Sequence, residues 1–250
     1  MSVLLVDAGN TRIKWAYLDG GRLSRSRAVA LNDVRLNALG RRLFAPARRV
    51  KRVVAVSVAG PRVRRALTQA ARSAQVPIRF IRTPSRAVGV TVGYTDPWRL
   101  GADRFVGLAG ARSLFPRVPV CVAGIGTALT VDLLGATGRH FGGAIIPGPK
   151  LMVATLLSET HGIRRRAQGG GRRSAGPFGR STRAAIEEGA RYACAAAIDR
   201  AVEEGVALTR RRPLAVLTGG GAPEVVKLLK SPCVVVPDLV LKGLAVLAAR

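Results

Sequence analysis

The stretch LLVDAGNTRIKW, residues 4–15, predicts a strand, a turn and a second strand, and the turn has two interpretations. In one reading, Asp7 ends a buried strand and Gly9 lets the backbone approach a ligand closely. Asn10 and Thr11 then add side-chain donors beside backbone N–H groups that can cradle phosphate oxygens. In the other reading the same residues form an ordinary hairpin, because Asp, Asn and Gly all favour turns. The stretch by itself supports both readings equally.

Charged side chains stand on both sides of this turn. Lys14 comes three residues after Thr11, where its ammonium group could neutralise phosphate charge. Asp7 could hold Mg²⁺, directly or through water, because magnesium prefers a carboxylate together with phosphate oxygens. The first hypothesis for residues 7–14 is therefore a combined phosphate and magnesium site.

Similar turns recur further along the chain. GIGTALTVD, residues 124–132, supplies Gly126 and Thr127, and LTGGGAPE, residues 217–224, places three glycines between an expected strand and an expected helix. Glycines there allow a nucleotide to approach closely, and a helix N-terminus favours negative charge. Each turn alone is a weak signal, but three of them at strand ends favour nucleotide binding.

Other classes of site are not expected, because their motifs are missing. The chain has neither the GxxxxGK[ST] sequence of a P-loop enzyme nor the G-x-S-x-G elbow of an acyl-transfer serine. The GxG that begins at Gly124 lacks the third glycine of a dinucleotide fingerprint, since Leu129 occupies that position. Three widely spaced cysteines and two histidines leave little basis for a metal cluster.

Short β-branched runs alternate with helical segments, which predicts an α/β fold. The expected strands span residues 3–6, 13–18, 53–58, 78–81, 118–122, 129–134, 214–217 and 234–236. The expected helices span residues 33–44, 62–75, 102–114, 150–157, 182–209, 222–229 and 239–249. Because a strand, a glycine-containing turn and a second strand open both halves, we predict two related domains, residues 1–116 and 117–250. One continuous doubly wound sheet remains the alternative.

Composition sets the broad class of protein. The 250 residues are 48% hydrophobic and 22% charged, as in folded globular chains. The net charge of +27 raises a nucleic-acid function, but the basic residues are mostly arginine, are spread along the chain, and accompany only 4% aromatic residues. A nucleic-acid partner is left open but not favoured. With no secretory signal, no membrane-spanning run and unpaired cysteines, we expect a cytoplasmic protein.

Two further segments carry candidate functions. In GYTDPWRLGADRF, residues 93–105, Asp103 and Arg104 fall at the start of an expected helix. Asp103 either caps that helix or acts as a base that deprotonates a substrate hydroxyl, and Arg104 is suited to gripping an anionic group. Residues 164–180 are rich in glycine and arginine, which predicts a mobile loop that serves as a linker or a lid.

Taken together, these segments resemble the type III pantothenate kinases, in the superfamily of acetate kinases, sugar kinases and actin. The matching stretches follow the family's order: DAGNTRIKW, GYTDPWRLGADRF, GIGTALTVD, FGGAIIPG, GRSTRAAIEEGA, LTGGGA and DLVLKGL. The resemblance implies two actin-like (ribonuclease H-like) α/β domains with an ATP cleft between them. It also implies phosphorylation of pantothenate by ATP to 4'-phosphopantothenate, the first step of coenzyme A biosynthesis.

The resemblance further implies roles for single residues. Asp103 would be the general base. The pantothenate site would be lined by Tyr94, Gly101, Asp103, Arg104 and Thr182. Thr182 would come from the second subunit of a homodimer, paired through the helix at 182–209, whose apolar stretch 192–198 suits a buried interface. The ATP phosphates and Mg²⁺ would be held by Asp7, Gly9, Asn10, Thr11, Lys14, Gly126 and Thr127, with Gly219 and Gly220 nearer the nucleoside.

The sequence departs from the family at two positions of interest. Gly124 replaces an aspartate that helps family members to bind a monovalent cation, K⁺ or NH₄⁺, so that cation site is uncertain here. Gly107 replaces an asparagine that follows the GADR motif. Because Asp7 and Asp103 remain, we expect an active enzyme. The alternatives are a non-enzymatic regulatory relative, similar to Bvg accessory factors and binding nucleic acid, and a kinase for another small hydroxylated acid.

Overall fold

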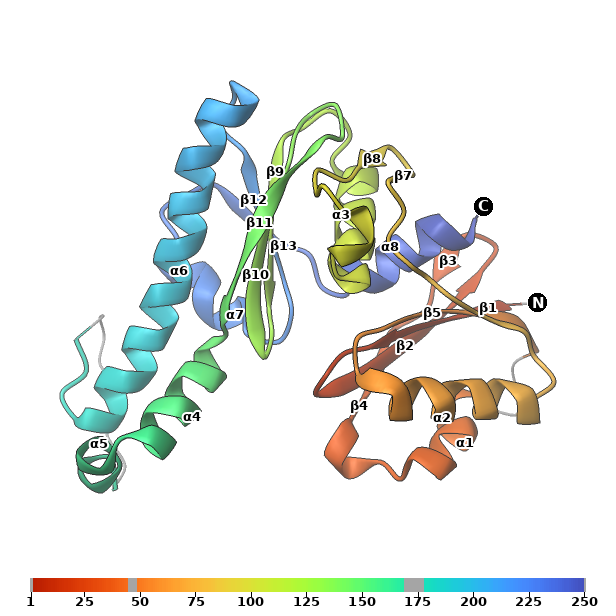
Figure 1. Ribbon diagram of the computed structural model, residues 1–250, viewed down its shortest axis with the longest axis horizontal. Coiled ribbons are helices and arrows are strands. Elements are labelled where there is room, and N and C mark those ends of the chain that lie inside the picture. The colour runs from red at the N-terminus through yellow and green to blue at the C-terminus, as the bar shows by residue number, and fades with distance from the viewer. Residues whose placement is uncertain (1, 45–48, 169–177, 250) are drawn as a thin grey trace. The chain divides into compact units, whose positions relative to one another are not determined.

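The computed structural model describes residues 2–44, 49–168 and 178–249 (Figure 1). They form two compact units. Unit 1 consists of Met1–Arg117, Thr137–His140 and Asp238–Arg250, and unit 2 consists of Val118–Ala136 and Phe141–Pro237. The sequence-based division assigned the C-terminal segment to the second domain. In the structure this segment is part of unit 1, because its helix packs on the sheet of that unit.

The sheet of unit 1 has the strand order β3-β2-β1-β5-β6, with β4 also paired to β2. Its strands are β1 (Ser2–Ala8), β2 (Arg12–Asp19), β3 (Arg22–Leu23), β4 (Arg27–Ala30), β5 (Val50–Ser57) and β6 (Ile78–Phe80). The β1–β2 hairpin is antiparallel, whereas β5 pairs parallel to both β1 and β6. The central strands β1 and β5 are apolar on successive residues because both faces of the sheet are covered.

Helices cover both faces of this sheet (Figure 1). On one face lie α1 (Leu39–Leu43) and α2 (Gly60–Ser73), preceded by the 3-10 turns η1 (Leu31–Asp33) and η2 (Leu36–Ala38). On the other face lie α3 (Ala102–Leu114) and α8 (Leu239–Ala248), which contact β5 and β1. The connection from β6 to α3 contains β7 (Arg86–Ala87), β8 (Val90–Thr91) and the 3-10 turn η3 (Pro97–Arg99).

Two glycines set the close approach of α3 and α8. A Cβ atom at Gly110 of α3 would lie 2.6 Å from the Leu239 carbonyl oxygen. One at Gly243 of α8 would lie 1.9 Å from the Val106 carbonyl oxygen. Because real Cβ contacts essentially never fall under 3.0 Å, the two backbones could not pack at this distance with larger residues.

Unit 2 repeats the pattern of unit 1. Its strands are β9 (Val120–Ile125), β10 (Ala128–Leu134), β11 (His140–Pro147), β12 (Leu214–Thr218) and β13 (Cys233–Val235). Their order is β11-β10-β9-β12-β13, with an antiparallel β9–β10 hairpin and parallel β9–β12 and β12–β13 pairs. A hairpin followed by two parallel strands thus occurs in both sheets, in agreement with the strand–turn–strand pattern that opens both halves of the sequence.

The long helix α6 (Thr182–Thr209) packs on the sheet of unit 2, close to α4 (Pro149–Glu159) and α5 (His161–Arg166). After β12 come α7 (Ala222–Val225) and the 3-10 turn η4 (Val226–Leu228). Cys194, Ala195 and Ile198 of α6 lie in the core cluster of unit 2 together with β9 and β10 residues. The apolar stretch 192–198 is therefore largely accounted for by this core, and by itself it is no sign of a subunit interface.

The structure also differs from the sequence-based expectations in its helices, loops and strands. Residues 33–44 form short turns and α1 rather than one helix, since Asn32, Asp33 and Asn37 compete locally with helical hydrogen bonding. The loop expected at 164–180 begins later, because Arg164–Arg166 continue α5, and residues 169–177 lie outside the described residues. The strands β3, β4, β7, β8 and β11 were not predicted. Across the described residues, no helix combines the length and apolar character needed to cross a bilayer.

Candidate functional site

The opening turn is a hairpin that keeps its polar residues accessible. The Gly9 N–H donates to the Arg12 carbonyl oxygen at 3.0 Å, closing the turn between β1 and β2. Asn10 and Thr11 are exposed. A Cβ atom at Gly9 would meet only the Arg12 carbonyl oxygen, at an ordinary 3.6 Å, so the hairpin itself does not require glycine there. The turn can therefore be both a hairpin and a phosphate cradle. Gly9 is not needed for packing, and its lack of a side chain leaves room for a ligand.

Asp7 and Lys14 face the same side of this hairpin. They are directly paired in the antiparallel register of β1 and β2, which places their side chains on one face of the sheet. Burial raises the pKa of the Asp7 carboxyl to about 7, and the nearby Asp103 and Asp238 carboxylates raise it too, while Lys14 opposes the shift. Asp7 therefore sits where negative charge is in excess, an environment that suits a bound cation.

This environment fits a magnesium ion. Mg²⁺ is commonly held by one or two carboxylates together with phosphate oxygens and water. Asp7 supplies such a carboxylate beside the turn. Within the described residues there is no group of three or more His, Cys, Asp or Glu side chains arranged around a metal, so a cation here depends on ligands from the nucleotide.

A second part of unit 1 gathers the residues of the GYTDPWRLGADRF segment. Asp103 lies in the first turn of α3, where its Oδ1 accepts the Arg104 N–H at 2.9 Å. The Arg104 guanidinium is buried and donates to the Tyr94 hydroxyl at 3.1 Å. Tyr94 stacks on His140, with ring centroids 5.7 Å apart. A Cβ atom at Gly101 would come within 2.8 Å of Asp103 Oδ1, so glycine at this position leaves the carboxylate its place.

The two roles considered for Asp103 are not exclusive. Its carboxylate satisfies one N–H of the first turn of α3, as a residue near a helix start does, while Gly101 is the N-cap and makes no side-chain bond. The electrostatic effect of Asp103 on Asp7 places it close to the hairpin within unit 1. A carboxylate in this position can accept a proton from a bound alcohol.

In unit 2 the second and third glycine turns come together at the end of β9. The Gly126 N–H donates to the Ala128 carbonyl oxygen at 2.9 Å, and Gly126 and Thr127 are exposed. Gly219 has a φ of +95°, and a Cβ atom there would come within 2.4 Å of the Ile125 carbonyl oxygen. Gly220 follows and is exposed. Glycine is thus required at 219, where the turn lies directly against the end of β9.

Thr182 lies in a different element of unit 2, the long helix α6. It is the first residue of α6, directly after the N-cap Ser181, whose hydroxyl accepts the Ala184 N–H at 3.1 Å. Within unit 1, the structure gathers the opening turn and the residues around Asp103, and within unit 2 it gathers Gly126, Thr127, Gly219 and Gly220. Thr182 belongs to neither set.

Gly124, where the family resemblance implies an aspartate, supplies no side-chain ligand for a monovalent cation. Gly124 lies in β9 directly opposite Thr130 of β10. A Cβ atom at Gly124 would lie 2.8 Å from Thr130 Oγ1, so the threonine hydroxyl occupies the space that a larger side chain would need. An aspartate at this position would fit only after Thr130 had rotated.

Sequence reasoning missed three residues beside the predicted site. Ser26 and Asp238 form a network with Lys14, and His140 stacks on Tyr94. The DLVLKGL stretch, which begins at Asp238, was noted only as part of a resemblance. Because Asp238 is far from Lys14 in sequence, spacing could not reveal their contact.

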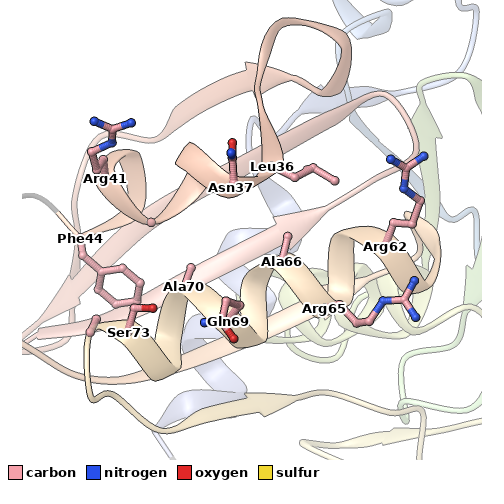
Figure 2. Close-up of a pocket in the computed structure, with 12 residues that line it drawn as sticks. Leu36, Asn37, Arg41, Phe44, Arg62, Arg65, Ala66, Gln69, Ala70 and Ser73 are labelled. Carbon is pink, nitrogen blue, oxygen red and sulfur yellow. The ribbon is translucent and has the colours of Figure 1, made fainter.

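A groove on another part of unit 1 carries none of the predicted residues. It has a volume of about 660 Å³ and lies between α2 and the segment formed by η2 and α1 (Figure 2). Apolar side chains such as Phe44 and Ala70 line it, together with Arg41, Arg62 and Arg65. The groove therefore does not contain the candidate binding and catalytic residues.

Comparison with known proteins gives consistent results. The family model described as type III pantothenate kinase matches residues 3–204. A curated type III pantothenate kinase of Nitrosococcus oceani is 37% identical over 249 residues, covering 97% of this chain and 92% of that protein.

Solved structures show a similar fold at low sequence identity. A conserved putative Baf family transcriptional activator from Campylobacter jejuni has a TM-score of 0.60 and 14% identity, with 98% of each chain covered. The activator of 2-hydroxyisocaproyl-CoA dehydratase from Clostridium difficile, with bound ADPNP, has a TM-score of 0.51 and 14% identity, covering 99% of this chain and 94% of that chain. These likenesses concern the fold alone, and they agree with the predicted actin-like α/β architecture.

Proposed function

This chain belongs to the type III pantothenate kinase family, and we propose that it transfers the terminal phosphoryl group of ATP to the terminal hydroxyl of pantothenate. The reaction opens the route to coenzyme A. One observation carries the proposal beyond family membership. Asp103 lies at the start of α3, next to the Arg104–Tyr94 pair and close enough to Asp7 to raise its pKa.

Asp103 is the proposed general base. Phosphoryl transfer needs a group that orients the acceptor hydroxyl and takes its proton as the new bond to phosphorus forms. Asp103 is partly exposed, and Gly101 beside it has no side chain that would displace the carboxylate. The Oδ1 atom accepts the Arg104 N–H, which orients the carboxylate at the start of α3.

Arg104 and Tyr94 are the proposed partners of the pantothenate carboxylate and amide groups, with Gly101 lining the site. Arg104 is held by the Tyr94 hydroxyl, and Tyr94 is held by the stack on His140. A guanidinium fixed in this way loses little side-chain entropy when it binds a carboxylate. The side chains that bind substrate are thus held in place by neighbouring side chains.

The nucleotide is assigned to the glycine turns. In unit 1, Asp7, Gly9, Asn10, Thr11 and Lys14 offer a cation ligand, exposed donors and a positive charge. In unit 2, Gly126, Thr127, Gly219 and Gly220 offer exposed backbone beside a strand end, with the glycines at 219 and 220 given to the nucleoside. Mg²⁺ bound with ATP supplies charge neutralisation for the transferring phosphoryl group. Asp7 would hold it, directly or through water.

A homodimer is also proposed, with Thr182 reaching the site of the partner subunit. Unit 2 supports this with apolar side chains that its own core leaves uncovered. In α4, an apolar helix, every residue is described and none is buried. Leu151 and Leu156 of this helix are 40% and 39% exposed, and Ile145 of the edge strand β11 is 65% exposed. A second copy seated on this face would remove them from water.

We also assign the protein to the cytoplasm, where pantothenate and ATP are available, and expect turnover without a specific K⁺ or NH₄⁺ requirement. The second statement is supported by Gly124, which has no carboxylate to bind such a cation. The non-enzymatic, nucleic-acid-binding alternative gains no support from the comparisons with known proteins.

The decisive experiment compares Asp103→Asn with Asp96→Asn in a coupled assay of ADP release with pantothenate, ATP and Mg²⁺. Asp96 lies in the same segment, is exposed and pairs with Arg99, so it is a matched control. Loss of the base should reduce turnover by about 10²–10⁴-fold, while the control keeps wild-type turnover. Circular dichroism checks that both variants fold. Wild-type turnover in Asp103→Asn would contradict the assigned role, and faster turnover with another hydroxylated acid would contradict the assigned substrate.

A further inference from the structure

Lys14 does not stand alone beside the opening turn. Its Nζ atom lies 3.0 Å from Asp238 Oδ1, and the two side chains are only 30% and 24% exposed. The other oxygen, Oδ2, accepts a hydrogen bond of 2.6 Å from the Ser26 hydroxyl. Both carboxylate oxygens are thus engaged, which fixes the Asp238 side chain in one orientation. Lys14 lies in β2, and Ser26 directly precedes β4, the strand that pairs with β2, so the network is anchored beside two neighbouring strands.

The backbone at Asp238 is unusual. Its φ of 54° and ψ of 35° place it in the left-handed region, where residues with a Cβ atom are uncommon. The same residue is the N-cap of α8, yet its side chain makes no capping bond to that helix. Glycine would adopt this conformation with less strain. Asp is one of the few residues with a Cβ atom that tolerate this conformation, and here it directs the carboxylate to Lys14 rather than to the helix.

The geometry leaves Lys14 free to act on a second partner. An ammonium group has three N–H donors, of which the contact to Asp238 occupies one. Lys14 is paired in register with Asp7, so its side chain lies on the face of the hairpin that carries the proposed phosphate and magnesium ligands. Asp238 and a phosphate group can therefore be bound by Lys14 at the same time.

We propose that Asp238, oriented by Ser26, is a positioning residue that holds the Lys14 ammonium ready for the phosphates of the nucleotide. The inference rests on the proposed function, because it takes Lys14 as a phosphate ligand. Preorganisation of this kind acts on nucleotide affinity, since the entropy of fixing a long side chain is lost before the ligand arrives. It leaves the acceptor site and the base untouched.

The test measures binding of the non-hydrolysable analogue AMPPNP with Mg²⁺ by calorimetry, and KM values for ATP and pantothenate. Asp238→Asn keeps the size of the side chain and its tolerance of the left-handed conformation but removes the charge. We expect nucleotide affinity to fall, and KM for ATP to rise, about tenfold, because a hydrogen bond between charged groups is weakened. KM for pantothenate should stay unchanged. Ser26→Ala should produce a smaller change in the same direction.

Three further variants separate positioning from a purely structural role. Asp238→Gly relaxes the backbone, so a structural role predicts wild-type affinity, whereas positioning predicts the same loss as Asp238→Asn. In a Lys14→Met background, Asp238→Asn should cause no additional loss. Asp19→Asn, on the exposed end of β2, makes the same change of charge away from the network and should bind like wild type.

The outcomes are distinct from those that test the reaction. Wild-type nucleotide affinity in Asp238→Asn, or an undiminished loss in the Lys14→Met background, would overturn the inference even if pantothenate is phosphorylated. A wild-type protein that binds nucleotide with the expected dependence on Asp238 but phosphorylates no pantothenate would support the inference and refute the substrate. A wild-type protein that binds no nucleotide overturns both.

Discussion

Replacing Gly243 of α8 by alanine should destabilise unit 1, although alanine is the better helix former. The new Cβ atom would lie 1.9 Å from the Val106 carbonyl oxygen and 2.8 Å from its carbon, whereas real contacts essentially never fall under 3.0 Å. Since backbone atoms cannot rotate away, α8 must move from α3 by about 1 Å, which loosens a close-packed interface. Overpacking of this kind costs about 1–3 kcal/mol, against a gain of about 1 kcal/mol in helix propensity. We expect a net loss of up to about 2 kcal/mol.

Gly107→Ala in α3 is the matched control. It makes the same change inside a neighbouring helix, at a buried position where an added Cβ atom meets no heavy atom within 4 Å. Only the propensity gain applies there, so stability should rise by up to about 1 kcal/mol. The two variants should therefore move in opposite directions.

Urea unfolding followed by tryptophan fluorescence measures this difference. Both tryptophans of the chain, Trp15 and Trp98, belong to unit 1, so the signal reports on the unit that holds the α3–α8 interface. Trp15 is 4% exposed and will change its emission on unfolding. If Gly243→Ala proved as stable as Gly107→Ala, the close backbone packing of α3 and α8 would not limit the residues allowed at 243.

Three other perturbations test the electrostatics and the cation. The pKa of Asp7 is raised from 3.8 to about 7 in the folded protein, so the stability of the ligand-free protein should fall as pH rises from 3.8 to about 7. Urea midpoints measured across this range should show that fall, and Asp7→Asn should reduce it. Arg191→Met leaves the buried Glu188 carboxylate without its ion-pair partner and should cost about 3–5 kcal/mol in thermal unfolding, with Glu188→Gln recovering part. An equally stable single variant would show that the pair is not desolvated. Because Gly124 supplies no carboxylate, turnover should be equal in K⁺ and Na⁺, and a strong K⁺ requirement of the wild type would contradict this. Gly124→Asp should gain K⁺ dependence, and adding Thr130→Ala, which removes the contact with Thr130 Oγ1, should enlarge that gain.

The helices and strands that could be predicted are those whose pattern is local. The expected helices at 102–114 and 182–209 occur at the same residues as α3 and α6, since a long amphipathic or apolar pattern bounded by glycine or serine is recognisable in the sequence. Short strands such as β3 and β7 have two residues each and exist through their partners, so no local pattern marks them. Strand pairing across the chain is a tertiary effect.

The same distinction holds for the candidate site. The opening turn was recognisable because Asp7, Gly9 and Asn10 are adjacent and unusual in composition. Tyr94 stacks on His140, which is 46 positions away in the sequence. Lys14 contacts Asp238, which is 224 positions away. Spacing carries no information about such contacts, so the groups that hold the site residues in place appear only in the structure.

The discontinuous make-up of unit 1 has a consequence for how the protein is made. All strands of its sheet precede residue 81, but α8, which buries leucines in this unit, lies in the segment Asp238–Arg250, after unit 2. While unit 2 is being translated, this face of the sheet is therefore covered by α3 but not yet by α8. Unit 2 can close earlier, since all of its strands precede residue 238. Removing residues 238–249 should therefore weaken unit 1, whose sheet would lose α8, more than unit 2, which keeps all of its strands.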